Sequence, residues 1–328
     1  ALSSAASDVY KRQDICMNFD IASELSGLFD FSKTIPSLTI SFIAASGILL
    51  LCACILVTFT ARRIVGLRFM PVLYGATSYL LFYIMIGSFL SGLLSLTIPQ
   101  GAGTATLAVA RFMVLLITSS LIVCGRFFAM WFIRKYYAEY CDAYGIGVGV
   151  ALTEAIITAV TIFLNYSLCL TLNSSGLAAL ANGYDTIEEA TRQLNDVWFL
   201  YSSPSYVYLF SGAESIMFLI FNTMISVMFY AVCHKELKRL HLVSIIGLQT
   251  LMYLPANFYS SGIIFNRIAC FITEIIIFAG CVFLFNRIHN KYYKDIKPPV
   301  REQKSSDKKG SKSSTGSKMP DFNKNINK

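Results

Sequence analysis

Seven long apolar segments constrain the fold of this chain more than any other feature. They cover residues 37–59, 72–97, 105–133, 144–172, 206–232, 242–262 and 263–286. Most exceed the roughly 20 residues that an α-helix needs to cross the hydrocarbon core of a bilayer. Only 14% of the residues are charged, against about 25% in soluble domains. The sequence therefore predicts an all-α, polytopic transmembrane helical bundle of about seven spans, in a cell membrane.

Basic residues predict how this bundle is oriented. The loops that follow the first, third and fifth segments carry Arg or Lys, and residues 287–328 hold 12 Lys or Arg against 4 Asp or Glu. These basic stretches all fall on one side of the membrane, and the positive-inside rule assigns that side to the cytoplasm. We expect the N-terminus outside and the C-terminus in the cytoplasm.

The chain divides into four parts. We interpret residues 1–13 as translated sequencing adapter, because they lack Met and any apolar run and contain the string SSAASDVYKRQ. Residues 14–36 should form an extracytoplasmic N-terminal segment, and residues 37–286 the transmembrane domain. Residues 287–328 are rich in Lys, Ser and Gly, which predicts a basic, disordered cytoplasmic tail.

The loop between the fourth and fifth segments contains a helix signal. Thr186 and Glu189 have the spacing of a capping box. Ile187, Leu194 and Trp198 then fall on one face at helical spacing. We expect an amphipathic helix that lies on the outer membrane surface.

Five charged side chains lie inside the apolar segments. A charge at the centre of a bilayer costs roughly 2.5–3.5 kcal/mol on insertion scales, so each needs a partner or a function. Positions at matched depth on neighbouring spans predict an Arg126–Glu154 pair and a second pair between Arg111 and Glu214. The five residues are Arg111, Arg126, Glu154, Glu214 and Glu274.

Uncharged polar residues follow the same segments. Asn222 and Ser226 share one face of the fifth span, while Gln249, Tyr253 and Asn257 surround a proline in the sixth. These faces predict a hydrated cavity within spans three to seven. A single buried ion pair could be purely structural, but a whole polar cluster favours a function.

Cofactor and nucleic-acid signals are weak. Cys52 and Cys54 form a C-x-C without a second pair or a nearby histidine, so we predict neither a metal site nor a disulfide. Gly145, Gly147 and Gly149 open a membrane helix without a preceding strand, which argues against a dinucleotide site. The basic tail lacks interleaved aromatics, which argues against nucleic acid as a partner. We expect the tail to be a solvated anchor that fixes the topology, with attraction to anionic lipid headgroups as the alternative, and membrane lipids to be partners of the chain.

Four short strings resemble a known family. The second half of the chain is similar, in motif order and spacing, to the YhfC family of glutamic intramembrane proteases, relatives of the CAAX-protease-like membrane peptidases. The similar core covers about 105–286, and Glu274 occupies a carboxylate position near the last span. The strings at 121–128, 149–156, 211–215 and 248–256 resemble, in turn, E-E-x-G-R-F, G-H-G-G-x-E-A-I, G-G-x-E-R and L-H-A-x-x-D-x-P-A.

The departures from these motifs matter as much as the matches. Arg126, Glu154, Glu214 and Pro255 are retained. The resemblance implies that glutamates activate water, with Glu154 and Glu214 as the catalytic residues of any active member. The other catalytic positions are substituted: the paired glutamates fall on Ile122 and Val123, the two histidines on Val150 and Gln249, and the aspartate on Tyr253.

Three functional hypotheses follow. Because Ile and Val cannot accept a proton, the first is a degenerate protease, a pseudoenzyme that binds a membrane-protein or peptide client in a polar intramembrane cavity. The alternative is a small proton- or cation-coupled transporter that uses the intramembrane glutamates. A lesser alternative is an active intramembrane peptidase.

Overall fold

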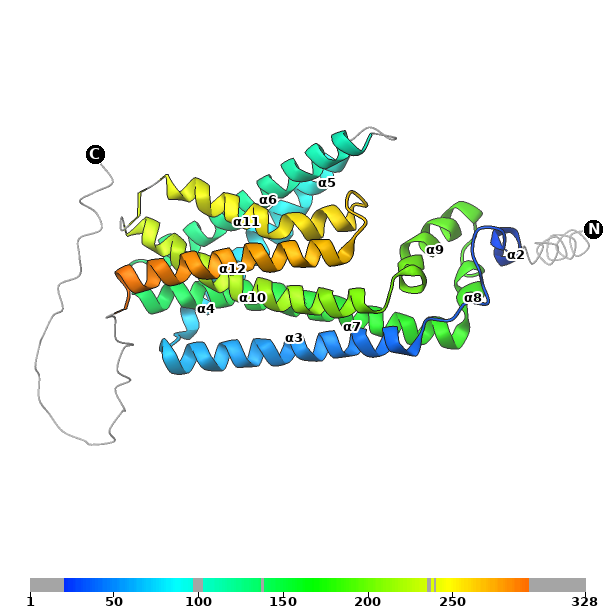
Figure 1. Cartoon of the computed structure of the whole chain (residues 1–328), viewed down its shortest axis with the longest axis horizontal. Helices are drawn as coiled ribbons and strands as arrows, with labels where there is room; N and C mark the ends of the chain where they lie inside the picture. The colour runs from blue at the N-terminus through cyan, green and yellow to red at the C-terminus, as the bar shows by residue number, and fades with distance from the viewer. Residues whose placement is uncertain (1–20, 97–102, 137–138, 235–236, 239, 295–328) are drawn as a thin grey trace, which may run out of the picture. The chain divides into compact units, whose positions relative to one another are not determined.

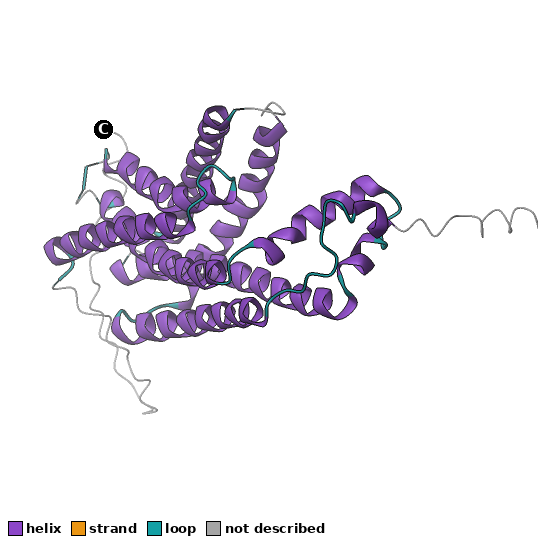
Figure 2. Cartoon of the chain, turned by 45° about the vertical axis from the view of Figure 1, so that its right-hand side comes forward, coloured by secondary structure: helices purple, strands orange, loops and turns teal. Residues whose placement is uncertain are grey.

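The computed structural model describes residues 21–96, 103–136, 139–234, 237–238 and 240–294. The predictions for residues 1–13 and for the tail beyond residue 294 lie outside this part of the chain. Every element within the described residues is helical (Figure 2). Seven of the described helices or helical runs are long and apolar enough to cross a membrane, which confirms the all-α, multi-pass prediction. The predicted orientation stays a prediction.

The spans follow the apolar segments closely, with one shift at the C-terminal end. The last helix continues through Arg287 to Tyr292, so these residues are helical and not part of a disordered tail as predicted. His289 and Lys291 lie in its final turn, where a positive charge interacts favourably with the negative end of the helix dipole. The spans are α3 (Ser37–Ile64), the run α4 (Phe69–Tyr79), η1 (Leu80–Gly87) and α5 (Ser88–Leu96), α6 (Thr104–Ile133), α7 (Tyr140–Ser175), α10 (Tyr206–Cys233), α11 (His241–Ser260) and α12 (Arg267–Tyr292) (Figure 1).

Small residues hold α7 close to its neighbours. A Cβ atom at Gly147 would lie 2.9 Å from the Thr223 carbonyl oxygen of α10, and one at Gly149 would collide with the Val72 carbonyl oxygen of α4. Ala151 and Ala155 continue the same stripe and are buried against α3 and α10. Such small residues let helix backbones approach closely within a membrane. The close approach brings the polar side chains of α7 and α10 together.

The second span is not a regular α-helix. Its central residues, Leu80–Gly87, form a π-helix between α4 and α5. π-Helical turns are rare and often occur at functional sites. This one begins directly after Tyr79, and both Tyr79 and Tyr83 turn toward the interior near α7, where their rings pack 4.9 Å apart.

Three short helices outside the membrane spans, α2 (Ile21–Leu25), α8 (Leu177–Ala181) and α9 (Ile187–Ser202), pack together at one end of α7, and we call them the cap. With 36 residues, α7 is about 54 Å long, which exceeds a hydrocarbon core of about 30 Å. The surplus carries the cap (Figure 1). Asn173 of α7 exchanges two hydrogen bonds with the backbone of Ile35, which ties the N-terminal segment to the cap.

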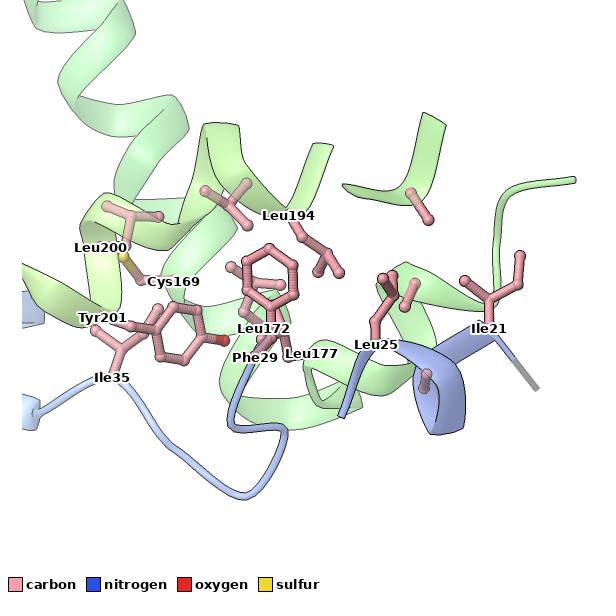
Figure 3. Packing of buried hydrophobic residues seen from close by; sticks show 14 of the residues in the cluster. Ile21, Leu25, Phe29, Ile35, Cys169, Leu172, Leu177, Leu194, Leu200 and Tyr201 are labelled. Atoms are coloured by element: carbon pink, nitrogen blue, oxygen red, sulfur yellow. The ribbon is translucent and has the colours of Figure 1, made fainter. Parts of the chain in front are cut away.

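The cap corrects one prediction from the sequence. The helix over 187–202 exists, and its Thr186 side chain accepts a hydrogen bond from the Glu189 backbone as predicted. Its apolar face does not lie on the membrane, however, because Leu194 and Leu200 are fully buried against α2, α8 and the end of α7 (Figure 3). The apolar face of α9 is therefore covered by protein, whereas the sequence pattern predicts that it lies on the membrane surface.

Candidate functional site

The guanidinium of Arg126 is a fully buried charge inside the bundle. This side chain projects from α6, is 0% exposed, and donates from each of its three nitrogens. The Nε atom donates to the Ser226 hydroxyl at 2.9 Å and Nη1 to the Gln249 Oε1 atom at 3.0 Å. The Nη2 atom donates to Asn222 Oδ1. Four residues from α6, α10 and α11 therefore form one hydrogen-bonded centre, which we call the Arg126 centre.

Glu154 of α7 joins this centre through Asn222. The Asn222 amide donates to Glu154 Oε2 at 2.5 Å, while its own oxygen accepts from Arg126. The Tyr253 hydroxyl donates to the two oxygens of the same carboxylate, at 2.8 and 2.9 Å. Within the described residues no direct ion pair joins Arg126 to Glu154. The predicted pair is therefore replaced by a relay, in which an amide dipole connects the two opposite charges.

The motif positions that lack catalytic side chains lie beside this carboxylate. Ile122 and Val150, where the family motifs place an acid and a histidine, are buried in an apolar cluster with Tyr79. Val150 precedes Glu154 by one helical turn on α7, so this apolar cluster lies on the same side of the helix as the carboxylate.

A second cluster of buried charge lies nearer to the cap end of the bundle. Arg267, the first residue of α12, forms an ion pair with Glu214 of α10 through its Nη2 atom. Its Nη1 atom lies 3.9 Å from Oε1 of Glu274, which is two turns along α12. We call these three residues the Arg267 cluster. Its guanidinium also stacks over the Tyr259 ring, 4.9 Å from the ring centroid.

The Arg267 cluster corrects the predicted Arg111–Glu214 pair. The carboxylate of Glu214 is bound by Arg267, and the buried Nε atom of Arg111 has no hydrogen-bond partner. Glu214 and Glu154 also have different partners: Glu214 pairs with Arg267, and Glu154 accepts from Asn222 and Tyr253. Glu214 and Asn222 are eight residues apart on α10, which separates the clusters by about 12 Å along the helix axis.

An apolar cavity of about 460 Å³ lies outside both clusters; Thr250, on the polar face of the sixth span that predicts a cavity, lines it, but Gln249, Tyr253 and Asn257 do not. Gln249 and Tyr253 bond within the Arg126 centre instead, while the buried Oδ1 atom of Asn257 has no hydrogen-bond partner. Two of the lining residues, Leu248 and Thr250, flank Gln249 in the sequence of α11. Its wall also includes Phe112 and Leu116 of α6, Gly247 and Leu251 of α11 and Leu284 of α12.

Sequence reasoning missed Arg267 and the two tyrosines of the second span. Arg267 was overlooked because it lies near the end of the predicted span, where a charge has little cost. Its spacing from Glu274 was a usable signal, since residues seven apart lie on the same face of a helix. Nothing in the sequence indicates the π-helix that follows Tyr79.

The chemistry of the Arg126 centre does not fit a bound metal ion. A catalytic zinc site needs three protein ligands drawn from His, Cys, Asp and Glu. The centre offers one such group, Glu154, and the oxygens of Asn222 and Gln249 already accept from the Arg126 cation. No group of three such ligands converges anywhere in the part of the chain that the structure describes.

Comparison with known proteins gives one match. A sequence model of the family described as YhfC intramembrane metalloprotease matches residues 48–277, more than half of the chain. No curated protein and no solved structure matches. The description names metal-dependent chemistry, whereas the motif resemblance implied glutamate-dependent chemistry. The Arg126 centre lacks the ligand set for the former and the second carboxylate for the latter.

Proposed function

The chain belongs to the YhfC intramembrane metalloprotease family, and we propose that it is a degenerate member that binds an apolar membrane segment without cutting it. One observation carries this proposal. Every described polar partner of Glu154 is a donor that fixes the carboxylate in place, and two of the substituted motif positions, Ile122 and Val150, are buried in an apolar cluster with Tyr79.

Peptide hydrolysis needs a group that takes a proton from water and a group that stabilises the developing oxyanion. Asn222 and Tyr253 already hold the Glu154 carboxylate by hydrogen bonds. Each Arg126 nitrogen likewise already donates to Ser226, Gln249 or Asn222. Because these contacts join α6, α7, α10 and α11, the centre is well suited to hold helices together.

The apolar cavity supports the binding part of the proposal. It lies beside the Arg126 centre, and its wall combines large apolar residues with the unobstructed Gly247. A glycine without neighbours gives a second helix room to approach the backbone of α11. An apolar transmembrane segment of a client protein fits the chemistry of this surface.

The transporter hypothesis has less support. A relay through all three glutamates would need contact between Glu154 and the Glu214–Glu274 pair. The separation of the two clusters along α10 leaves no such contact within the described residues. A proton-coupled flux that Glu274→Gln abolishes would still favour that hypothesis over ours.

Client binding can be tested by photocrosslinking in living cells. A photoreactive amino acid at Leu251, which lines the cavity and is 44% exposed, should crosslink to the apolar span of another membrane protein. The matched control is the same amino acid at Ile276 of α12, which is 66% exposed and outside the cavity. We expect protein adducts at Leu251 and only lipid adducts at Ile276.

The adducts also report on cutting. Mass spectrometry should place each crosslink in an uncleaved transmembrane segment of the client. The photoreactive amino acid can also be placed at Phe112, which lines the same cavity. If the proteins labelled at Leu251 and at Phe112 both fold normally but give no protein adduct, the client-binding proposal is wrong. If the adducts carry new ends within a membrane segment, the degenerate assignment is wrong.

A further inference from the structure

The Arg267 cluster carries an excess of negative charge in a buried position. It contains two carboxylates and one guanidinium, so its formal charge is −1 when all three groups are ionised. Glu214 and Glu274 are 5% and 0% exposed, and Arg267 is 6% exposed. A buried charge without compensation is costly, so proteins neutralise it with a counter-ion or with a proton.

The hydrogen-bond inventory shows where such an ion would bind. Both carboxylate oxygens of Glu274 are buried and have no hydrogen-bond partner, and neither has Oε1 of Glu214. These three oxygens remain after Arg267 has bound Oε2 of Glu214. Fully buried carboxylate oxygens without a donor are rare in folded proteins. The unpartnered side chain of Glu274 therefore points to a ligand that supplies positive charge.

From this arrangement we infer that Glu214 and Glu274 form a binding site for one small monovalent cation, with Arg267 as its fixed wall. One positive charge brings the cluster to neutrality, whereas a divalent ion would leave an excess. The guanidinium excludes a second cation by repulsion. The ligand is a proton shared by the two carboxylates or an alkali-metal ion bound by their oxygens.

The groups around the Arg267 cluster do not compensate its formal charge of −1. The charged and titratable groups near Glu274 are Arg267 and Cys270 on its own helix and Glu214 on α10, while the Tyr259 ring of α11 lies against the Arg267 guanidinium. Neither the thiol nor the phenol adds a positive charge. The cation that completes the cluster must therefore come from outside the described residues.

The cluster also lies within reach of one membrane surface. Glu214 is eight residues from the start of α10, and Glu274 is seven residues from the start of α12. Both carboxylates are thus about 10–12 Å from the cap end of their helices. Arg267 lies at that end itself. This inference does not rest on the proposed client binding.

The test uses the full-length protein in lipid nanodiscs with Glu labelled by carbon-13. Infrared spectra should be recorded for wild type, Glu274→Gln and the control Glu188→Gln, an exposed glutamate on α9. Thermal unfolding of the same samples should be followed in sodium, potassium or choline chloride, because choline is too large for the site.

The two sources of charge give different results. A bound proton predicts a carboxylic C=O band at neutral pH that Glu274→Gln loses and Glu188→Gln keeps, with the same unfolding temperature in all three salts. A bound alkali-metal ion predicts no such band. It predicts instead a higher unfolding temperature in sodium or potassium than in choline, a difference that Glu274→Gln abolishes.

The inference is overturned if wild type shows neither signature. The absence of both signatures in wild type needs no variant, so this result overturns the inference even if Glu274→Gln does not fold. A band or salt effect that Glu274→Gln leaves unchanged would also overturn the site, since it would arise elsewhere in the protein.

Discussion

The Arg126 centre and the Arg267 cluster are built from the same kinds of side chain but are completed in different ways. Around Arg126 each guanidinium nitrogen has an acceptor, and one carboxylate balances one cation through Asn222. Around Arg267 two carboxylates share one cation, and three of their four oxygens have no hydrogen-bond partner. The first arrangement is complete within the protein, whereas the second needs a ligand.

This difference indicates which buried charges carry function. An intramembrane charge is a functional hypothesis by default, yet a fully bonded, electrically neutral group can be purely structural. Under our proposal, the retained motif residues Arg126 and Glu154 are structural. The group without a hydrogen-bond donor is Glu274.

The largest effect should come from Arg126→Ala. The substitution leaves the acceptors of Asn222, Gln249 and Ser226 without their donor. Removing one partner of a buried charge network typically lowers the free energy of unfolding by about 3–5 kcal/mol. Equilibrium unfolding in detergent micelles measures this loss. The double change Arg126→Leu/Glu154→Leu should recover much of it, and additive losses would show that the two charges are not coupled.

The same substitution in each cluster should have different effects. Glu154→Gln takes an acceptor from the donors Asn222 and Tyr253, which should cost about 1–3 kcal/mol. Glu274→Gln removes a carboxylate that has no hydrogen-bond donor, so in choline chloride, where no alkali-metal ion is bound, we expect a smaller loss of stability than for Glu154→Gln. Unfolding midpoints of the two variants compare them directly. Equal losses would remove the distinction between the clusters.

Helix packing around the two clusters gives a smaller contrast. A Cβ atom at Gly149, on the helix that carries Glu154, would collide with the backbone of α4, so Gly149→Ala should cost about 1–3 kcal/mol. Gly280 is on α12, the helix that carries Glu274, and has nothing within 4 Å of an added Cβ. Gly280→Ala should therefore be close to neutral. The same unfolding assay checks both, and a neutral Gly149→Ala would contradict the close approach of α4 and α7.

The sequence predicted the membrane fold well because apolar length is a local signal. The seven spans and the helix over 187–202 follow from residue spacing within one segment. The family also could be recognised from short motifs. Each of these features depends on neighbours in the chain.

The partners of the buried charges could not be predicted to the same extent. Matching depths placed Arg126 near Glu154, but only the packing of α6, α7 and α10 puts Asn222 between them. Depth alone also suggested Arg111 for Glu214, whereas the α10–α12 contact selects Arg267. Which faces of two helices meet depends on every other helix in the bundle, and that information is not local.

The most direct test of the central claim is a survey of terminal peptides in the membrane proteome of the host cell. It compares cells that express the intact protein with cells that express folded Glu154→Gln at a matched level. We predict the same set of peptide ends in both, because the Arg126 centre binds its carboxylate and does not use it for hydrolysis. New ends inside transmembrane segments, present only with the intact protein, would contradict the account and show that Glu154 is catalytic.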